Sequence, residues 1–249
     1  LTRIIGFFLV PIHTNAFNRT EYSVAMLTYV FLGFMNVIYM YGLDVAFVRY
    51  YVLEKKPDIR KKIFSTTVMT LFGTSCILSS LIYLFPGYFS TLTFESGHYT
   101  DFIRYAGGIL FFDAISILGL HYLRAEQRSS LYGAIRIFTS LLVLVLNIAY
   151  IILLKEGPIA IFKANFHASL LTFVLLIPVV FKRVRFQYSF SAIKDILNFG
   201  IPYIIPNLAL IIMEIIDRRQ ILSYLGEELP GVYSTGYKLG MAMGVLIAG

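Results

Sequence analysis

The sequence predicts an all-α, polytopic transmembrane protein, and three observations support this prediction. Of the 249 residues, 58% are hydrophobic and only 14% are charged, whereas soluble domains carry about 25% charged residues. The mean hydropathy is +0.76. Apolar stretches of about 20 residues, the length that crosses a bilayer as a helix, recur along the chain. This composition also excludes a disordered chain, which needs low hydrophobicity and high charge.

Six apolar stretches are long enough to span a bilayer. They are residues 23–42, 63–85, 102–123, 131–154, 159–181 and 196–216. Shorter apolar stretches at 1–12 and 233–249 lie at the two ends of the sequence. We therefore expect eight spans, with the chain truncated at both ends.

Basic residues alternate between the connections that join these spans. The second, fourth and sixth connections carry Lys55, Lys56, Arg60, Lys61, Lys62, Arg124, Arg128, Lys182, Arg183, Arg185 and Lys194. The other connections carry Arg19, Lys155, Arg218 and Arg219. Because cytoplasmic connections hold the excess of Lys and Arg, the first span is expected to run from the cytoplasm to the outside. The net charge of +7 therefore indicates membrane topology and no nucleic-acid partner.

Prolines interrupt two of the spans. Pro11 lies near the outer end of the first, and Pro202 and Pro206 lie in the seventh. A proline removes a backbone donor and bends a helix, although membrane helices tolerate proline without a special purpose. The first and seventh spans share an orientation and a short polar exit followed by Tyr-Ser. This spacing of six spans per unit suits two parallel six-helix lobes.

Two charged residues lie near the middle of their spans, counting about 1.5 Å per residue. Charged side chains at that depth are costly and usually face a cavity or a partner. Arg3 either lines a cavity or extends to the nearer interface. Asp113 either binds a coupling ion or pairs with an arginine.

Further basic residues lie close to span ends. Lys163, Arg136 and Lys238 are each about five residues from an end, within reach of the interface for such long side chains. Lys163 and Lys238, together with Arg218, also form a candidate basic rim at the outer mouth of a cavity.

Acidic residues accompany basic ones at two span ends. Asp44 and Arg49 flank the inner end of the second span, and Arg49 is expected at the cytoplasmic mouth. Glu214 and Arg218 have i, i+4 spacing near the outer end of the seventh span, which suits an ion pair.

The sequence contains no motif of a catalytic or nucleotide-binding site. The four histidines are scattered, and the single cysteine, Cys76, lies inside an apolar stretch. We therefore expect neither an enzyme nor a cofactor or metal site.

Three stretches carry a resemblance to a known family. They are Leu1-Thr2-Arg3-Ile4-Ile5-Gly6-Phe7-Phe8-Leu9-Val10-Pro11, then Gly42-Leu43-Asp44 through Arg49-Tyr50, and finally Gly200-Ile201-Pro202 with Asp217-Arg218, Tyr224-Leu225-Gly226, Gly231-Val232-Tyr233 and Lys238. In order and span position they resemble bacterial polysaccharide-repeat flippases of the Wzx type. These proteins belong to the multidrug/oligosaccharidyl-lipid/polysaccharide exporter superfamily.

The resemblance implies roughly twelve to fourteen helices in two lobes around a central cavity. Residues 1–195 would form the first six-helix lobe, and residues 196–249 the truncated start of the second. It implies a protein of the bacterial cytoplasmic membrane that flips undecaprenyl-diphosphate-linked oligosaccharides to the outer leaflet for surface polysaccharide biosynthesis. Its expected partners are that substrate and the lipid bilayer, and a polysaccharide polymerase is a further candidate.

The resemblance also assigns candidate site residues. Arg3, Arg49, Arg218 and Lys238 would contact the diphosphate or acidic sugars, because a diphosphate needs fixed positive charge in a low-dielectric place. Lys163 joins them as part of the basic rim. The candidates for ion coupling are Asp113, Asp44 and Glu214.

The alternative function is a cation-coupled multidrug exporter of the same fold, in which those acidic groups would serve cationic drugs. Two further alternatives are a lipid-linked peptidoglycan-precursor flippase and a membrane-embedded glycosyltransferase or polymerase. The longest outer connection, about residues 86–101, is too short for the extracytoplasmic loop that the last class needs. Eight basic residues against four acidic ones within or beside the spans favour an anionic substrate.

Overall fold

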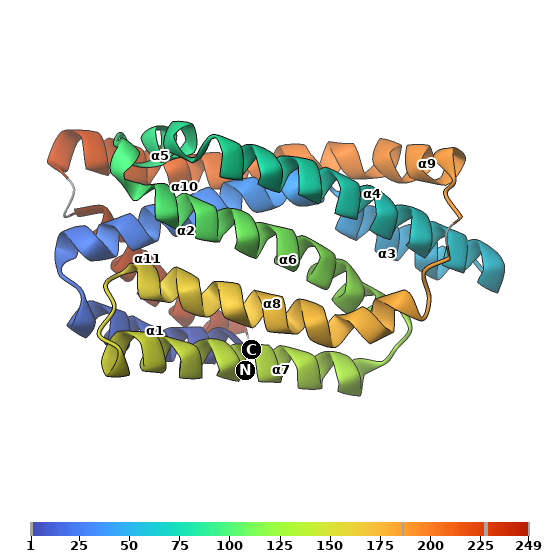
Figure 1. The fold of residues 1–249 in the computed structure, drawn as a ribbon, viewed down its shortest axis with the longest axis horizontal. Helices are drawn as coiled ribbons and strands as arrows, with labels where there is room; N and C mark the ends of the chain where they lie inside the picture. The colour runs from blue at the N-terminus through green and yellow to red at the C-terminus, as the bar shows by residue number, and fades with distance from the viewer. Residues whose placement is uncertain (1, 186, 227–228, 249) are drawn as a thin grey trace.

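The computed structural model describes residues 2–185, 187–226 and 229–248, without the side chains of residues 2–8, 210, 214, 215, 218, 238, 239 and 241–248. This part of the chain is a bundle of helices that lie roughly along one axis (Figure 1). The helices are α1 (Thr2–Ala16), α2 (Arg19–Met40), α3 (Leu43–Leu53), α4 (Pro57–Leu84), α5 (Pro86–Phe94), η1 (Gly97–Tyr99), α6 (Thr100–Ala125), α7 (Ser129–Ile148), η2 (Ala149–Leu153), α8 (Ile159–Phe181), α9 (Phe190–Gly200), η3 (Ile201–Tyr203), α10 (Ile204–Leu225) and α11 (Leu229–Ala248).

The six full-length spans expected from the sequence are confirmed. Among the described residues, six helical segments are long and apolar enough to cross a membrane, at Arg19–Met40, Pro57–Leu84, Gly97–Ala125, Ser129–Leu153, Ile159–Phe181 and Phe190–Met213. The two partial stretches at the ends of the sequence are the helices α1 and α11.

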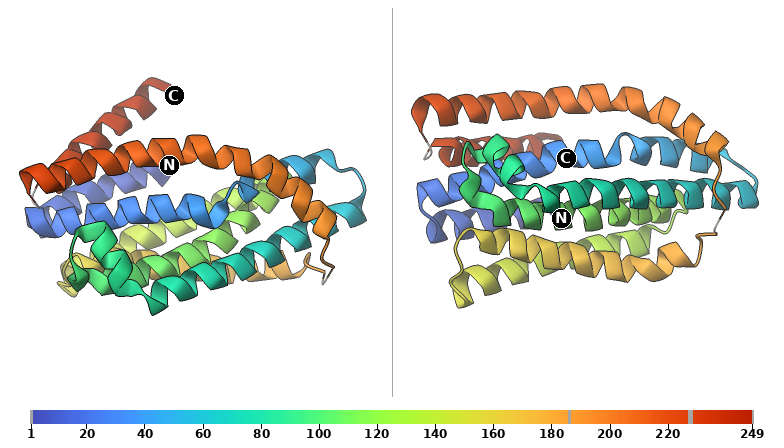
Figure 2. Two further views of the ribbon diagram at one scale, coloured as in Figure 1. Left: turned by 90° about the horizontal axis from the view of Figure 1, so that it is seen from above. Right: turned by 45° about the horizontal axis from the view of Figure 1, so that its top comes forward.

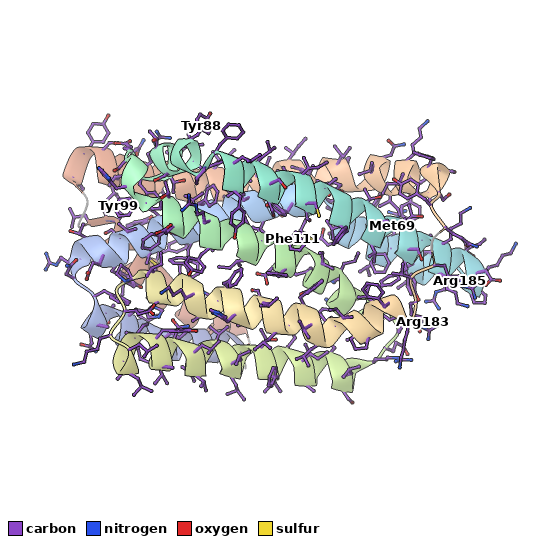
Figure 3. The ribbon with its side chains drawn as sticks, in the orientation of Figure 1. Met69, Tyr88, Tyr99, Phe111, Arg183 and Arg185 are labelled. Carbon is purple, nitrogen blue, oxygen red and sulfur yellow. The ribbon has the colours of Figure 1, made fainter. Side chains whose placement is uncertain are left out.

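The connections alternate between the two ends of the bundle. Arg183 and Arg185 lie at one end, whereas Tyr88 and Tyr99 lie at the other (Figure 3). The connections rich in Lys and Arg all lie at the first end, here called the basic end, and the opposite end is called the α5 end. The charge alternation in the sequence therefore corresponds to a spatial separation of charge.

The second span is broken near the basic end. Tyr41 and Gly42 take left-handed backbone conformations, with φ of 32° and 77°, between α2 and α3. At Gly42, a Cβ atom would overlap the carbonyl oxygen of Gly200, so the position requires glycine for two reasons.

The seventh span is also irregular, as its prolines predicted. It consists of α9, the 3-10 turn η3, which contains Pro202, and α10, whose first turn contains Pro206. Pro11, by contrast, lies within the continuous helix α1.

The helix α6 forms the centre of the bundle. It packs against α2, α4 and α8, and most of its residues are buried. The Ser79 hydroxyl on α4 donates to the Gly107 carbonyl on α6 at 3.2 Å and also bonds the hydroxyl of Tyr39 on α2 at 2.8 Å. Buried hydroxyl groups thus join three spans where no water can satisfy them.

The helices after the sixth connection lie on one side of α2. Seen from above, α10 and α11 are on one side of α2, and α4, α6 and α8 are on the other (Figure 2). α2 contacts both α10 and α11, and α3 contacts α9. The broken spans α2–α3 and α9–α10 therefore run next to each other.

Candidate functional site

A polar cavity lies between α2, α6, α7 and α8. Its volume is about 460 Å³. The polar residues that line it are Tyr29, Asn36, Asp113, Ser116, Arg136, Thr139, Asn165, Ser169 and Thr172. Polar side chains within apolar spans are energetically costly, and a group of them usually marks a site for a ligand or an ion.

Asp113 supplies the carboxylate of this cavity. It lies near the middle of α6 and is half-buried. Its carboxyl group accepts a hydrogen bond from the Ser169 hydroxyl of α8 and interacts electrostatically with Arg136 of α7. One turn along α6, the buried hydroxyl of Ser116 has no hydrogen-bond partner among the described residues. Carboxylate and hydroxyl oxygens are ligands for hard cations, so this corner can hold a small cation or a proton.

Hydrogen bonds between spans hold the cavity lining in place. The Asn165 amide on α8 donates to the Tyr29 hydroxyl on α2 at 2.9 Å. The hydroxyls of Thr139 on α7 and Thr172 on α8 are 2.8 Å apart. α8 is thereby joined to α2 and α7 in the lining of the cavity.

Asp44 lies nearer the basic end, in the first turn of α3. It is half-buried and interacts electrostatically with His121 of α6, which also interacts with Arg136. Asp44 and Arg136, which lines the Asp113 cavity, thus both act electrostatically on His121.

Arg49 lies where α3 meets α9. Its guanidinium carbon is 4.2 Å from the ring centroid of Phe199, and the Tyr50 ring contacts the same phenylalanine edge-on at 6.2 Å. Beside them the backbones of Gly42 and Gly200 are in direct contact. Arg49 is therefore part of the contact between the two broken spans at the basic end.

Lys163 lies on another face of α8 from the cavity. Its ammonium group forms an ion pair with Glu156 at 2.8 Å. Together with Arg104 and Tyr105, it lines a separate pocket of about 500 Å³ at the α5 end.

The remaining predicted site residues lie on helices of the described backbone. Arg3 is in α1, Glu214 and Arg218 are in α10, and Lys238 is in α11. Their side chains are outside the described part of the chain.

Sequence reasoning missed several residues of the cavity. Arg136, which the sequence places within reach of the interface, is exposed and also lines the cavity. Tyr29, Asn36 and Asn165 were not singled out, although amides within apolar spans are a signal of buried polar sites. Among the described residues, no group of three or more His, Cys, Asp or Glu side chains is placed to hold a metal ion.

Comparison with known proteins identifies a family. A family model described as "Polysaccharide biosynthesis protein" matches residues 17–249. No curated protein matches the sequence.

Several solved transporters share the fold. A crystal structure of MATE in complex with MaD3S has a TM-score of 0.74 and 16% identity, covering 96% of this chain and 57% of that one. A transporter of the MOP superfamily from Pyrococcus furiosus, described as having a binding pocket of reverse polarity, has a TM-score of 0.70 and 16% identity, covering 96% and 58%. An outward-facing MATE family multidrug resistance transporter has a TM-score of 0.72 and 16% identity, covering 97% and 59%.

The chain spans 57–59% of the length of these three solved structures. It has the fold of the MOP superfamily transporters, as the resemblance implied, over part of their length. The six apolar helices and this fold together identify a multi-pass membrane protein.

Proposed function

The chain belongs to the family described as polysaccharide biosynthesis proteins, and from this premise we propose that the full-length protein is a flippase for lipid-linked oligosaccharides. It moves undecaprenyl-diphosphate-linked repeat units from the inner to the outer leaflet of the bacterial cytoplasmic membrane. The observation that carries the proposal is the family match over residues 17–249 in a chain with a transporter fold. The protein acts by transport and not as an enzyme.

The proposed flippase has two lobes, with the first formed by residues 1–195. The second begins at 196 and continues beyond the seventh and eighth spans. Two features support the division. The connection at 182–189 separates α8 from α9 shortly before the proposed boundary, which itself lies within α9. In addition, α10 and α11 lie across α2 from α4, α6 and α8.

The proposed orientation places the basic end in the cytoplasm. Its support is the excess of Lys and Arg in the connections gathered there. The first span then runs from the cytoplasm to the outside.

The proposed contacts to the diphosphate are basic side chains near α1, α3, α10 and α11. They are Arg3, Arg49, Arg218 and Lys238. Arg49 has the clearest structural support, since its guanidinium lies at the α3–α9 contact and is exposed. The sequence predicts Lys163 as a further substrate contact, as part of the basic rim. Its ion pair with Glu156 at the α5 end favours a separate role.

The proposed coupling site is the Asp113 cavity. A carboxylate beside Ser169 and an unpartnered Ser116 hydroxyl provides oxygen ligands for a cation or a site for a proton. Asp44 is a second candidate for ion coupling, because it interacts electrostatically with His121, which also interacts with Arg136 of the cavity. Glu214, the third candidate, rests on the sequence alone.

The alternative function is a cation-coupled multidrug exporter. It is favoured by the fold, which the chain shares with multidrug resistance transporters of the MATE family. The polar cavity around a carboxylate is also compatible with a cationic drug.

Deletion of the full-length gene distinguishes the two functions. The flippase proposal expects loss of surface polysaccharide and accumulation of the lipid-linked repeat unit on the cytoplasmic side, with unchanged resistance to cationic drugs. A plasmid copy of the gene should restore the polysaccharide. Normal polysaccharide together with new sensitivity to ethidium-like cations would support the exporter instead.

A further inference from the structure

Two cavities lie along the face of α6 between α4 and α8, one at the α5 end and one nearer the basic end. We call these cavities and the row of side chains between them the groove. Gly107 and Gly108 on α6 bring the neighbouring side chains close to its backbone. A Cβ atom at Gly107 would lie 2.9 Å from Cγ2 of Ile82 on α4, and one at Gly108 would lie 2.8 Å from Cδ2 of Phe166 on α8. Figure 3 shows Met69 of α4 and Phe111 of α6 on this face, which lies on the other side of α2 from α10 and α11 (Figure 2).

The α5 end of the groove is the pocket of about 500 Å³ that contains Lys163. It is lined by Tyr83, Asp101, Arg104, Tyr105, Ile159, Lys163 and Phe166. We call it the head pocket. Two ion pairs border it, Arg104–Asp101 at 3.1 Å and Lys163–Glu156 at 2.8 Å. The Tyr83 hydroxyl lies within electrostatic range of Arg104 and of the Tyr105 hydroxyl.

The charges at the head pocket balance: Asp101, Arg104 and Lys163 line it, and Glu156, whose Oε2 atom is buried, pairs with Lys163. Two basic and two acidic side chains surround it, and their exposed fractions are 50% and 69% in the Arg104–Asp101 pair and 29% and 28% in the Lys163–Glu156 pair. An exposed ion pair such as Arg104–Asp101 contributes about 0–1 kcal/mol. A ligand that offers one positive and one negative group can therefore exchange partners with such a pair at little cost.

A row of aromatic rings continues from the head pocket into the membrane-spanning part. Successive centroid distances are 5.8 Å for Tyr105–Phe166, 5.7 Å for Phe166–Phe112 and 5.4 Å for Phe112–Phe173. Phe173 in turn lines an apolar cavity of about 250 Å³ between α4, α6 and α8. The groove thus changes from charged to wholly apolar along its length.

The length of the aromatic row matches one leaflet of a bilayer. Lys163 and Phe173 are ten residues apart on one helix, or about 15 Å at a rise of about 1.5 Å per residue. The hydrocarbon core of a bilayer is about 30 Å thick, so half of it corresponds to this length. A lipid with its headgroup at Lys163 would therefore end its acyl chain near Phe173.

We propose that this groove binds a phospholipid whose headgroup carries both a phosphate and a primary ammonium group, as phosphatidylethanolamine does. The phosphate lies between Arg104, Lys163 and the tyrosine hydroxyls, and the ammonium group takes Asp101 and Glu156. An anionic phospholipid such as phosphatidylglycerol lacks a partner for the two carboxylates. One acyl chain lies along the aromatic row. The orientation proposed above makes this an outer-leaflet lipid, but the binding itself does not depend on that orientation.

Lipid retention tests the headgroup contacts. The full-length protein is incubated in detergent with phosphatidylethanolamine or phosphatidylglycerol, and the lipid that remains after gel filtration is quantified. We expect at least about threefold more phosphatidylethanolamine to be retained. Because a partly exposed charged contact is worth up to about 1 kcal/mol, Arg104→Gln and Lys163→Gln should each lower that retention about three- to fivefold.

A matched variant distinguishes the effect of the pocket residues on lipid retention from the effect of the overall charge at this end of the bundle. Lys155 is exposed at the same end and does not line the pocket, so Lys155→Gln should leave retention unchanged. The double change Asp101→Asn and Glu156→Gln should abolish the preference over phosphatidylglycerol. Equal retention of the two lipids by the unaltered protein would overturn the proposal, as would an equal loss in Lys155→Gln and Lys163→Gln.

A fluorescence measurement tests the chain position without altering the head pocket. Phe112→Trp places a reporter in the aromatic row, and Phe138→Trp places one on α7, where Phe138 is 47% exposed. Phosphatidylethanolamine with brominated acyl chains should quench the fluorescence of Phe112→Trp more than brominated phosphatidylglycerol does. The two brominated lipids should quench Phe138→Trp equally. Equal quenching at Phe112→Trp would contradict the proposal. Neither experiment measures transport, so both remain decisive if the proposed flippase activity proves wrong.

Discussion

Substituting Gly200 by alanine tests the contact between α3 and α9 at the basic end. Gly200 has an ordinary right-handed backbone, with φ of −75°, so alanine introduces no strain in its own conformation. The added methyl group would instead meet the backbone of Gly42, with its Cβ 2.7 Å from the carbonyl oxygen and 2.9 Å from the carbonyl carbon. The effect therefore comes from the contact alone.

The size of the effect follows from this distance. An ordinary van der Waals separation begins at about 3.4 Å, so α9 has to move away from α3 by about 0.7 Å. The obstacle is backbone, which cannot turn aside as a side chain can. Overpacking of this kind costs about 1–3 kcal/mol. If the contact breaks when the basic end opens, the ratio of open to closed forms should rise at least about fivefold.

Spin labels measure this ratio directly. Lys55 follows α3 and Lys194 is on α9, and both are exposed. Cysteines at these two positions, in full-length protein whose other cysteines including Cys76 are replaced, carry the labels. Pulsed electron paramagnetic resonance then gives the distribution of distances between α3 and α9. We expect Gly200→Ala to increase the population with longer distances.

Gly73→Ala provides the matched control. Gly73 is a glycine of the spanning helix α4, and a Cβ atom there would have no neighbour within 4 Å. Gly73→Ala should therefore leave the distribution of distances between α3 and α9 unchanged. If Gly200→Ala gives the same distribution as Gly73→Ala, the α3–α9 contact does not hold the basic end closed and the reasoning fails.

Three other outcomes are expected from the proposed topology and site. Single cysteines in the basic connections should resist an impermeant thiol reagent in intact cells, and labelling of all three from outside would reverse the orientation; the positions are 55–62, 124–130 and 182–195. Arg3→Ala in the full-length protein should abolish polysaccharide export at normal membrane levels, while Arg3→Lys keeps part of it because charge remains but the bidentate fork is lost; full export by Arg3→Ala would exclude a substrate contact. Asp113→Asn should weaken transport or its dependence on an ion gradient, and unchanged transport across a range of gradients would leave Asp113 a structural role only.

The sequence predicted the spans well because long apolar helices have a strong local signal. The irregular seventh span was also foreseeable from Pro202 and Pro206. The break after α2 was not, since it places Tyr41 at φ of 32°, a conformation that tyrosine rarely adopts. Tertiary packing enforces it, because Gly42 must approach the backbone of Gly200, which lies far away in the sequence.

The candidate cavity was only half predictable. Depth along the span identified Asp113, because a single charge in an apolar helix stands out. Depth alone did not identify Arg136 as a cavity residue, because it lies near enough to a helix end for the interface to be the simpler expectation. Which face of α7 meets α6 depends on how the spans rotate against one another. The central helix α6 is largely buried on every side, so its apolar pattern does not reveal which face borders the cavity.

Arg49 connects the proposed substrate contact with the closed form of the basic end. In the structure its guanidinium covers the ring of Phe199 at 4.2 Å, an interaction worth about 0.5–1 kcal/mol at an exposed site. Hydrogen bonds from a guanidinium to a charged group are worth about 1.5–3 kcal/mol, so a diphosphate that reaches Arg49 would outcompete the ring. The α3–α9 contact would then lose this stacking and keep the Gly42–Gly200 packing and the edge contact of Tyr50. Substrate arrival would thereby loosen the basic end, and by reciprocity any change that loosens this end, such as Gly200→Ala, should raise the affinity of Arg49 for a diphosphate.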